Sequence, residues 1–208
     1  MIDAAGELRA RRATPRGEQH LKQRELLDFL RRLECLKTNG RHSTTVGGIT
    51  ETVAAHSWRL AVLALLIAPE FEEIDGNKLV RMCLIHDFGE AITGDIPSFL
   101  KTKEHEASED NAVQTLLSAL PEPQRGSLSA LFAEMDAHES TEARLYKALD
   151  KLEAVIQHNE SDISTWLPLE YELQQTYAVE NASEFPYLKE LCALMLEDTL
   201  KKIDDAKA

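Results

Sequence analysis

Apolar residues recur along most of the chain at intervals of three and four positions, the spacing that places side chains on one face of an α-helix. No segment shows the sustained alternation of apolar and polar residues that is typical of a strand, and Gly and Pro fall between the helical patterns. The pattern therefore predicts an all-α protein. Helices are predicted over about residues 19–36, 51–68, 77–93, 103–120, 124–136 and 141–158, with a further helix after Pro168 and a last one from Phe185 to about Ile203.

The chain has 208 residues, which is enough for one domain with a sizeable core. We expect residues 1–20 to form a flexible N-terminal tail, because Pro15 and Gly17 interrupt any regular pattern there. Residues 21–208 are then expected to form a single domain. The segment at residues 37–50 is rich in Gly, Ser and Thr and is predicted to be a loop.

The segment at residues 82–95 begins as a helix with an apolar face and ends with side chains that commonly bind metals. His86 and Glu90 continue the three-four spacing of the apolar residues before them, so the pattern places both on a buried face. The adjacent His86-Asp87 pair is hard to explain by packing, because a buried carboxylate is costly unless it is paired or bound to a metal. We therefore expect this pair to hold a divalent cation, with further ligands supplied by distant parts of the chain.

Two other residues are candidates for those ligands. His56 lies on the apolar stripe of the second predicted helix, and Asp150 lies beside the stripe of the long helix at 141–158. Taken singly, a buried histidine is more often a hydrogen-bonded core residue, and Asp150 could be a surface or capping group. Together with His86 and Asp87, they form a set of imidazole and carboxylate ligands that suits Zn, Mn, Fe, Co or Ni. Four protein ligands would leave coordination positions open, as a hydrolytic site requires.

These residues resemble the signature of the HD-domain metal-dependent phosphohydrolase superfamily. The most specific part is His86-Asp87-x-x-Glu90 followed by Thr93-Gly94-Asp95-Ile96-Pro97, which is closest to the branch of bacterial 5'-deoxynucleotidases and their HD-domain-containing relatives. The resemblance covers most of residues 21–203 and is carried by the segments 36–64, 82–97 and 147–157.

The resemblance implies a helical HD-domain bundle with the metal site between core helices. It implies a homodimer that hydrolyses (deoxy)ribonucleoside 5'-monophosphates to nucleoside and phosphate. It also implies one divalent metal ion per chain, which would be Co, Mn, Zn, Mg, Ni or Fe. By this resemblance the metal ligands are His56, His86, Asp87 and Asp150, the catalytic residues are Glu90 and Asp87, and the substrate-binding residues are Arg41, His42 and Asp95.

The resemblance also assigns roles within this set. Glu90 resembles the carboxylate that helps to activate or protonate groups around the scissile phosphate, Asp95 the residue that contacts the sugar, and Arg41 the arginine that holds the phosphate. Each residue also has a structural alternative. Glu90 could be a solvated carboxylate at a helix end, Asp95 a turn residue after Gly94, and Arg41 a surface cation. The chain departs from the deoxynucleotidase pattern at two positions, with His42 in place of a tryptophan and Ala55 in place of an acidic residue.

Composition narrows the classes of partner. The formal net charge of −13 argues against binding to a nucleic-acid polymer, although a single nucleotide needs only a few local cations. The longest apolar run, at residues 60–68, is too short to span a bilayer, so no membrane association is expected. The three isolated cysteines indicate a reduced, cytoplasmic protein.

Two other functions remain open at this stage. One is a dinuclear HD phosphodiesterase or oxygenase, because His105 and His138 lie between the His86-Asp87 pair and Asp150, where dinuclear relatives place extra histidines. We expect both to be surface residues, since they lie in polar, charged surroundings. The other is a non-catalytic regulatory domain that keeps a metal for stability.

Overall fold

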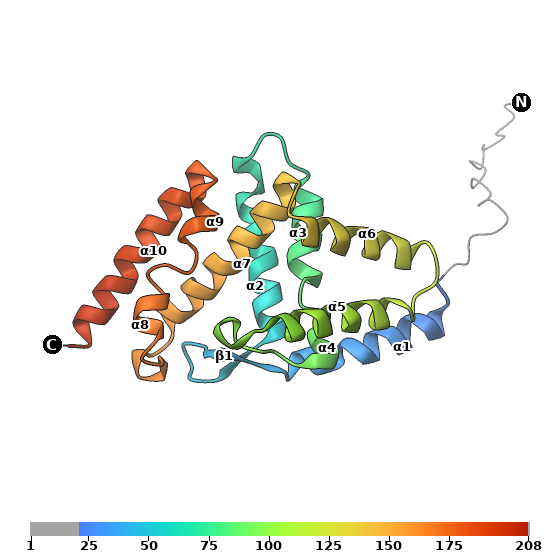
Figure 1. The fold of residues 1–208 in the computed structure, drawn as a ribbon, viewed down its shortest axis with the longest axis horizontal. Coiled ribbons are helices and arrows are strands. Elements are labelled where there is room, and N and C mark those ends of the chain that lie inside the picture. Colours follow the sequence, from blue (N-terminus) through green and yellow to red (C-terminus); the bar gives the residue numbers. More distant parts are fainter. Residues whose placement is uncertain (1–20, 208) are drawn as a thin grey trace, which may run out of the picture.

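The computed structural model describes residues 21–207, so the predicted tail at 1–20 lies outside the described part (Figure 1). As predicted, the fold is helical. The helices are α1 (Gln23–Leu33), α2 (Val53–Ile67), α3 (Gly76–Ile85), α4 (Glu90–Thr93), α5 (Lys103–Leu117), α6 (Gln124–Ala137), α7 (Thr141–Glu160), α8 (Glu170–Leu173), α9 (Val179–Ser183) and α10 (Pro186–Asp205), with short 3-10 turns at Glu34–Lys37, Ala68–Glu70, Ser98–Leu100 and Ile163–Thr165.

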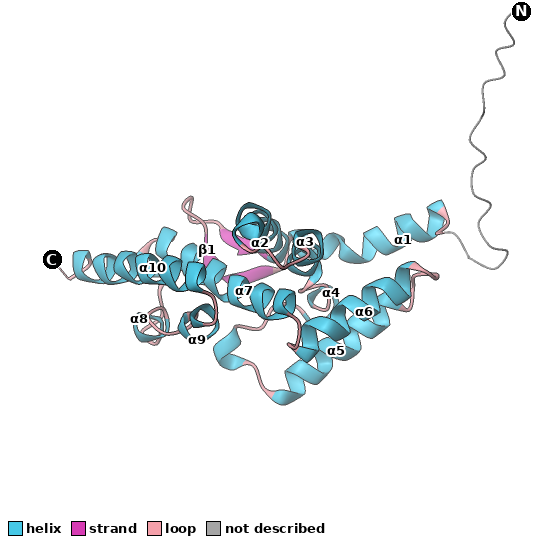
Figure 2. Ribbon diagram, turned by 90° about the horizontal axis from the view of Figure 1, so that it is seen from above, coloured by secondary structure: helices cyan, strands magenta, loops and turns pink. Residues whose placement is uncertain are grey.

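The core lies where α2, α3 and α7 pack against one another. Figures 1 and 2 show α7 across the middle of the molecule, with α9 and α10 toward one end and α1, α5 and α6 toward the other. α7 forms the centre of the core, because its apolar stripe is buried along its length. A helix is stabilised when its apolar face is covered in this way. Core side chains with at most 1 % exposure include Leu60, Leu79, Met82, Leu145, Leu149 and Leu152.

The segment predicted to be a loop at residues 37–50 was assigned wrongly in part. It forms a short antiparallel hairpin of β1 (Gly40–Thr44) and β2 (Thr50–Thr52), in which Gly40 pairs with Thr52 and Thr44 with Thr50. β-Branched threonines favour strands, and Gly48 supplies the positive φ of 74° that the connecting turn needs. The hairpin leads directly into α2 and holds residues 41–43 beside the core.

The predicted third helix is interrupted. α3 ends at Ile85, and residues 86–89 form a turn. The turn is held by hydrogen bonds between residues three apart in sequence, such as Glu90 N–H to Asp87 C=O at 3.0 Å. His86 and Glu90 are therefore not on one continuous helical face, contrary to the spacing argument. Asp87 in this turn and Glu90 at the start of α4 both line the cleft, and α4 ends before Gly94, whose φ is 73°.

Two further predictions change. The chain after Pro168 forms the two short helices α8 and α9 instead of one, and α5 ends at Leu117. The helical stretch from Val53 to Glu70 is long and apolar enough to cross a membrane, whereas the apolar run judged from the sequence was too short. Its inner face is nevertheless packed against α3 and α7 and carries the fully buried His56, as expected of a core helix.

Shortening a core side chain of α7 tests this packing. Leu149 has no exposed surface, so Leu149→Ala removes buried methyl groups and leaves a cavity. We expect the free energy of unfolding, measured with urea, to fall by about 2–5 kcal/mol. Leu194→Ala on α10 is the matched control, because Leu194 is 60 % exposed. Equal losses in the two variants would contradict the assignment of the core.

Candidate metal centre and cleft

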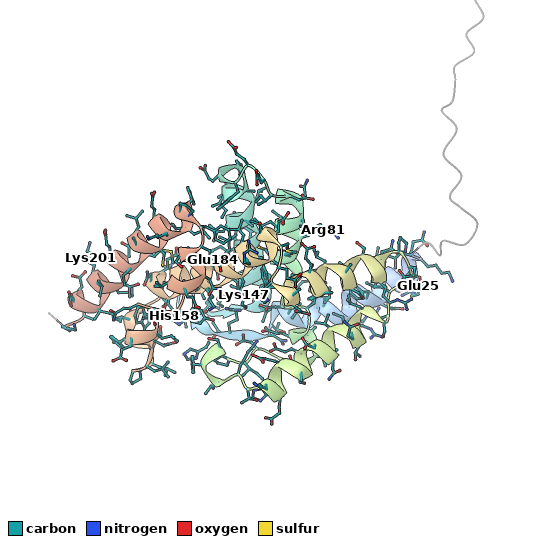
Figure 3. All side chains as sticks on the ribbon, turned by 45° about the horizontal axis from the view of Figure 1, so that its top comes forward. Glu25, Arg81, Lys147, His158, Glu184 and Lys201 are labelled. Atoms are coloured by element: carbon teal, nitrogen blue, oxygen red, sulfur yellow. The ribbon has the colours of Figure 1, made fainter. Side chains whose placement is uncertain are left out.

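A cleft of about 310 Å³ opens beside the core helices. Its walls come from β1, from the turn after α3, from the loop at residues 95–101 and from α5, α7 and α8. Figure 3 marks Lys147 and His158, two residues of α7 that line it. Among the residues proposed from the sequence, those in the cleft wall are Arg41, His42, His86, Asp87, Glu90, Asp95 and Asp150.

The four predicted metal ligands converge at the base of this cleft. His56 Nε2 lies 3.2 Å from His86 Nε2 and 3.1 Å from Asp150 Oδ1. His86 Nε2 lies 3.0 Å from Asp87 Oδ2 and 3.6 Å from Asp150 Oδ1. Two ligand atoms bound at right angles about 2.1 Å from one ion stand roughly 3.0 Å apart. The spacing of these atoms therefore fits a divalent cation held by His56, His86 and Asp87, with Asp150 Oδ1 beside both histidines.

The other ring nitrogen of each histidine is already engaged. His86 Nδ1 lies 2.9 Å from the Cys83 carbonyl oxygen, to which only an N–H can donate. His56 Nδ1 is bonded to the Glu153 carboxylate. In the neutral rings both Nε2 atoms would carry lone pairs that face each other, and a shared cation would fit between them.

The charge around His56 is strongly negative. Burial and the nearby Arg41 lower the pKa of His56, but hydrogen bonds to Asp150 and Glu153 outweigh them and raise it to about 10. Burial alone would raise the pKa of Asp87 and Asp150, yet positive neighbours hold both well below the usual range. The site therefore keeps its carboxylates ionised and attracts a cation, and metal binding at His56 displaces a proton.

Glu153 is a functional residue that the sequence argument missed. It is 1 % exposed, contacts His56 from one turn beyond Asp150, and accepts a hydrogen bond of 2.6 Å from Arg59 Nε. A carboxylate on the far nitrogen of a metal-binding histidine orients the ring and strengthens it as a ligand. Its three-residue spacing from Asp150 was the available signal. Ala55, where the family pattern has an acidic residue, is exposed on α2 and takes no part in this arrangement.

Arg41 is held over the cleft by several carboxylates. Its Nη1 lies 3.4 Å from Asp87 Oδ2 and 4.0 Å from Asp95 Oδ1, and its Nε lies 3.3 Å from Glu51 Oε2. Ser43 Oγ donates to the same Glu51 oxygen at 2.7 Å. Arg41 is thus no free surface cation. The buried Glu51, which sequence reasoning also missed, fixes its position.

Glu90 is buried beside these charges. Its Oε2 has no hydrogen-bond partner among the described residues, and its side chain faces the cleft. Burial, followed by the negative charges of Asp87 and Asp95, raises its pKa to about 9. Burial also raises the pKa of Asp95, although Arg41 opposes the shift. Glu90 therefore carries a proton at neutral pH and can donate it within the cleft.

The far end of the cleft combines aromatic rings with a buried carboxylate. His42 Nε2 lies 3.2 Å from Glu170 Oε1, and its ring meets the Phe99 ring edge-on at 5.6 Å. His158 Nε2 lies 3.0 Å from the same Glu170 oxygen. Glu170 and Phe99 were not predicted, because nothing local in the sequence relates them to His42.

The two histidines considered for a second metal lie outside the cleft wall. His105 Nδ1 accepts the Thr102 N–H at 3.3 Å in the cap of α5. His138 is exposed at the end of α6, where its backbone is left-handed and Nδ1 lies 3.0 Å from the Asp136 carbonyl oxygen. Both have local structural roles in the described part of the chain.

Comparison with known proteins places these features in a family context. The sequence matches the family model described as HD domain over residues 33–207. It is 33 % identical over 141 residues to the 5'-deoxynucleotidase HDDC2 of Homo sapiens, covering 66 % of this chain and 68 % of that protein. It is 32 % identical over 139 residues to the 5'-deoxynucleotidase YGK1 of Saccharomyces cerevisiae, covering 63 % and 64 %.

Solved structures have the same architecture. A protein described as a predicted metal-dependent phosphohydrolase from Magnetospirillum magnetotacticum MS-1 superposes with a TM-score of 0.76 at 26 % identity. The match covers 86 % of this chain and 93 % of that one. A conserved hypothetical protein from Pyrococcus furiosus gives a TM-score of 0.63 at 29 % identity, covering 83 % and 98 %.

Neutralising Glu153 tests the support of the metal centre. We expect Glu153→Gln to weaken binding of Mn²⁺ or Co²⁺ by about 10- to 100-fold, because the ring of His56 loses its orienting charge. Calorimetric titration of the metal-free protein measures the affinity. Glu160→Gln is the matched control, since Glu160 also pairs with Arg59 but is 46 % exposed. An unchanged affinity in Glu153→Gln would rule out the orienting role.

Proposed function

Because the chain belongs to the HD-domain family, we propose that it is a metal-dependent phosphohydrolase that converts deoxyribonucleoside 5'-monophosphates to nucleosides and phosphate. The observation that carries the proposal is the convergence of four candidate metal ligands, one arginine and one buried carboxyl group with a raised pKa at a single cleft. Relatives that are named 5'-deoxynucleotidases support this substrate class.

His56, His86, Asp87 and Asp150 would hold one divalent ion at the base of the cleft. Such an ion supplies polarisation of a phosphoryl oxygen and activation of water. Phosphate monoesters hydrolyse extremely slowly in water, so the remaining acceleration must come from how the protein positions and protonates the substrate. The carboxylates of the site repel the negative charge of the phosphate, so cationic side chains must face the substrate.

Arg41 supplies one such cation. Glu51 and Asp87 hold the guanidinium, whose planar N–H groups match the geometry of phosphate oxygens. Since the guanidinium is already ordered before substrate enters, little entropy is lost when it binds phosphate. Its neighbour Asp95 lines the same cleft and would accept a hydrogen bond from a hydroxyl group of the sugar.

Glu90 serves as the general acid. As water attacks phosphorus and the bond from phosphorus to the 5'-oxygen breaks, the Glu90 carboxyl group gives its proton to that oxygen. The proton released by the attacking water then restores the carboxyl group. The raised pKa of about 9 supports this direction of transfer, because the group is protonated when the reaction begins.

The nucleoside part of the substrate would extend toward His42. The ring of His42 contacts Glu170 and Phe99. Because it is an imidazole, it presents a smaller and more polar surface than a tryptophan would. This difference bears on which sugars and bases fit. We also infer that the chain from residue 21 onward forms one domain. Its three free thiols support a cytoplasmic location.

A second copy of the chain is the expected partner of α2. The helix exposes an uncharged stripe, in which Trp58 is 65 % and Leu65 62 % exposed, with Ala55 also exposed and Val62 half-buried between them. Two chains of net charge −13 repel each other over most of their surface, so a face without charges is where they can approach. A twofold contact through α2 would bury this stripe.

The proposed activity is tested by measuring phosphate release from a panel of nucleoside monophosphates in the presence of Mn²⁺ or Co²⁺. We expect release from deoxyribonucleotides, and in Glu90→Gln a kcat lower by about 100- to 10,000-fold with metal content retained. Glu106→Gln, at an exposed carboxylate of α5, should behave as wild type. Metal-loaded protein that releases no phosphate from any of these nucleotides would refute the proposal.

The dimer is tested by light scattering after gel filtration. We expect the wild type to elute with the mass of two chains and Trp58→Lys with the mass of one, because a charge in the α2 stripe would be buried without a partner. Leu194→Lys, at a comparably exposed leucine of α10, should remain dimeric. A wild-type protein of single-chain mass would exclude the α2 interface.

A further inference from the structure

Lys147 is another cationic side chain in the cleft wall, besides Arg41. It lies on α7 one turn before Asp150, lines the cleft, and its side chain is 36 % exposed (Figure 3). The ring of the buried Tyr146 lies beneath its ammonium group, with the nitrogen 5.9 Å from the ring centre. The same ring stands 5.6 Å from that of His86, so Lys147 is adjacent to the metal centre.

The two oxygens of Asp150 divide their contacts. Oδ1 faces His56 Nε2 at 3.1 Å and His86 Nε2 at 3.6 Å, which is the side of the metal ligands. Oδ2 accepts a hydrogen bond from Lys147 Nζ at 3.0 Å. The ammonium group is therefore separated from the metal position by the width of one carboxylate.

Asp87 also lies between a histidine and a cation, but it makes both contacts through one oxygen. Its Oδ2 lies 3.0 Å from His86 Nε2 and 3.4 Å from Arg41 Nη1. Each of the two carboxylate ligands thus has one cationic side chain beside it. Arg41 comes from β1 and Lys147 from α7, so the two cations reach the metal centre from separate elements that both line the cleft.

The ammonium group also has hydrogen-bonding capacity to spare. It carries three N–H groups, and within residues 21–207 its one hydrogen-bond acceptor is Asp150. A plain salt bridge between residues three apart on an exposed helix contributes little to stability. Here the pair lies in a cleft beside a candidate metal ligand. The N–H groups of Lys147 that do not bind Asp150 are available to an anion in the cleft.

We propose that Lys147 binds the phosphoryl group of the substrate together with Arg41. This assignment rests on the proposed phosphohydrolase function, since it names a second phosphate-binding residue in the same cleft. Two cations from separate elements would neutralise the dianion and orient it against the metal centre. Lys147 would then touch the substrate directly, and its contact with Asp150 would place the ammonium group before substrate arrives.

The test is direct binding of inorganic phosphate to metal-saturated protein, measured by calorimetry. Lys147→Met is expected to weaken phosphate binding by about 10- to 100-fold, the loss typical of a hydrogen bond between charged groups. Lys147→Arg should recover much of it. Lys151→Met is the matched control, because Lys151 lies one turn away over the Tyr177 ring and outside the cleft wall, and its phosphate affinity should equal that of wild type.

Metal affinity separates this role from a structural one. If Lys147 only positions Asp150, Lys147→Met will bind the metal more weakly but, once saturated with metal, will bind phosphate like the wild type, and the proposal is then overturned. Binding of deoxyadenosine, which has no phosphate, should be unchanged in the variant. These measurements need no turnover, so a wild type that binds phosphate through Lys147 but hydrolyses no nucleotide would contradict the proposed function and leave the role of Lys147 supported.

Discussion

The site depends on keeping several carboxylates ionised inside a protein core. Asp87 and Asp150 face two buried imidazoles, and Glu51 and Glu153 stand directly behind them. Moving such charges out of water is costly, so each must be offset by a cation or a hydrogen bond. The metal ion, Arg41, Arg59 and Lys147 are the groups available for this, and the arrangement of the whole cleft follows from that requirement.

The helices meet this requirement through their packing. α2 and α7 pack together in the core, so His56 and Asp150 are presented from helices whose inner faces are buried. His86 and Asp87 come instead from the turn that ends α3. Because the chain leaves helical geometry there, Asp87 turns toward Arg41 and Glu90 faces the cleft. A continuous helix would have kept these side chains one above another on a single face.

The hairpin before α2 connects the candidate metal centre to the other end of the cleft. It carries Arg41, beside the metal ligands, and His42, beside the buried carboxylate of Glu170. Under the proposed function, these adjacent residues would bind the phosphate and the nucleoside ends of one substrate. The substitution of histidine for the family's tryptophan is consistent with its surroundings, because Glu170 offers a hydrogen-bond acceptor to an imidazole N–H.

The sequence by itself determined the helical class and most helix positions, and it selected the four candidate metal ligands that the fold brings together. Apolar periodicity reports which face of each helix is buried, and a histidine or aspartate on such a face is conspicuous because burial is costly. The tertiary structure alone decided the break after Ile85, the hairpin, and the partners Glu51, Glu153, Glu170 and Lys147. These depend on contacts between residues far apart in the chain, and a carboxylate or lysine among many on a charged protein carries no local mark of what it will meet once the helices pack.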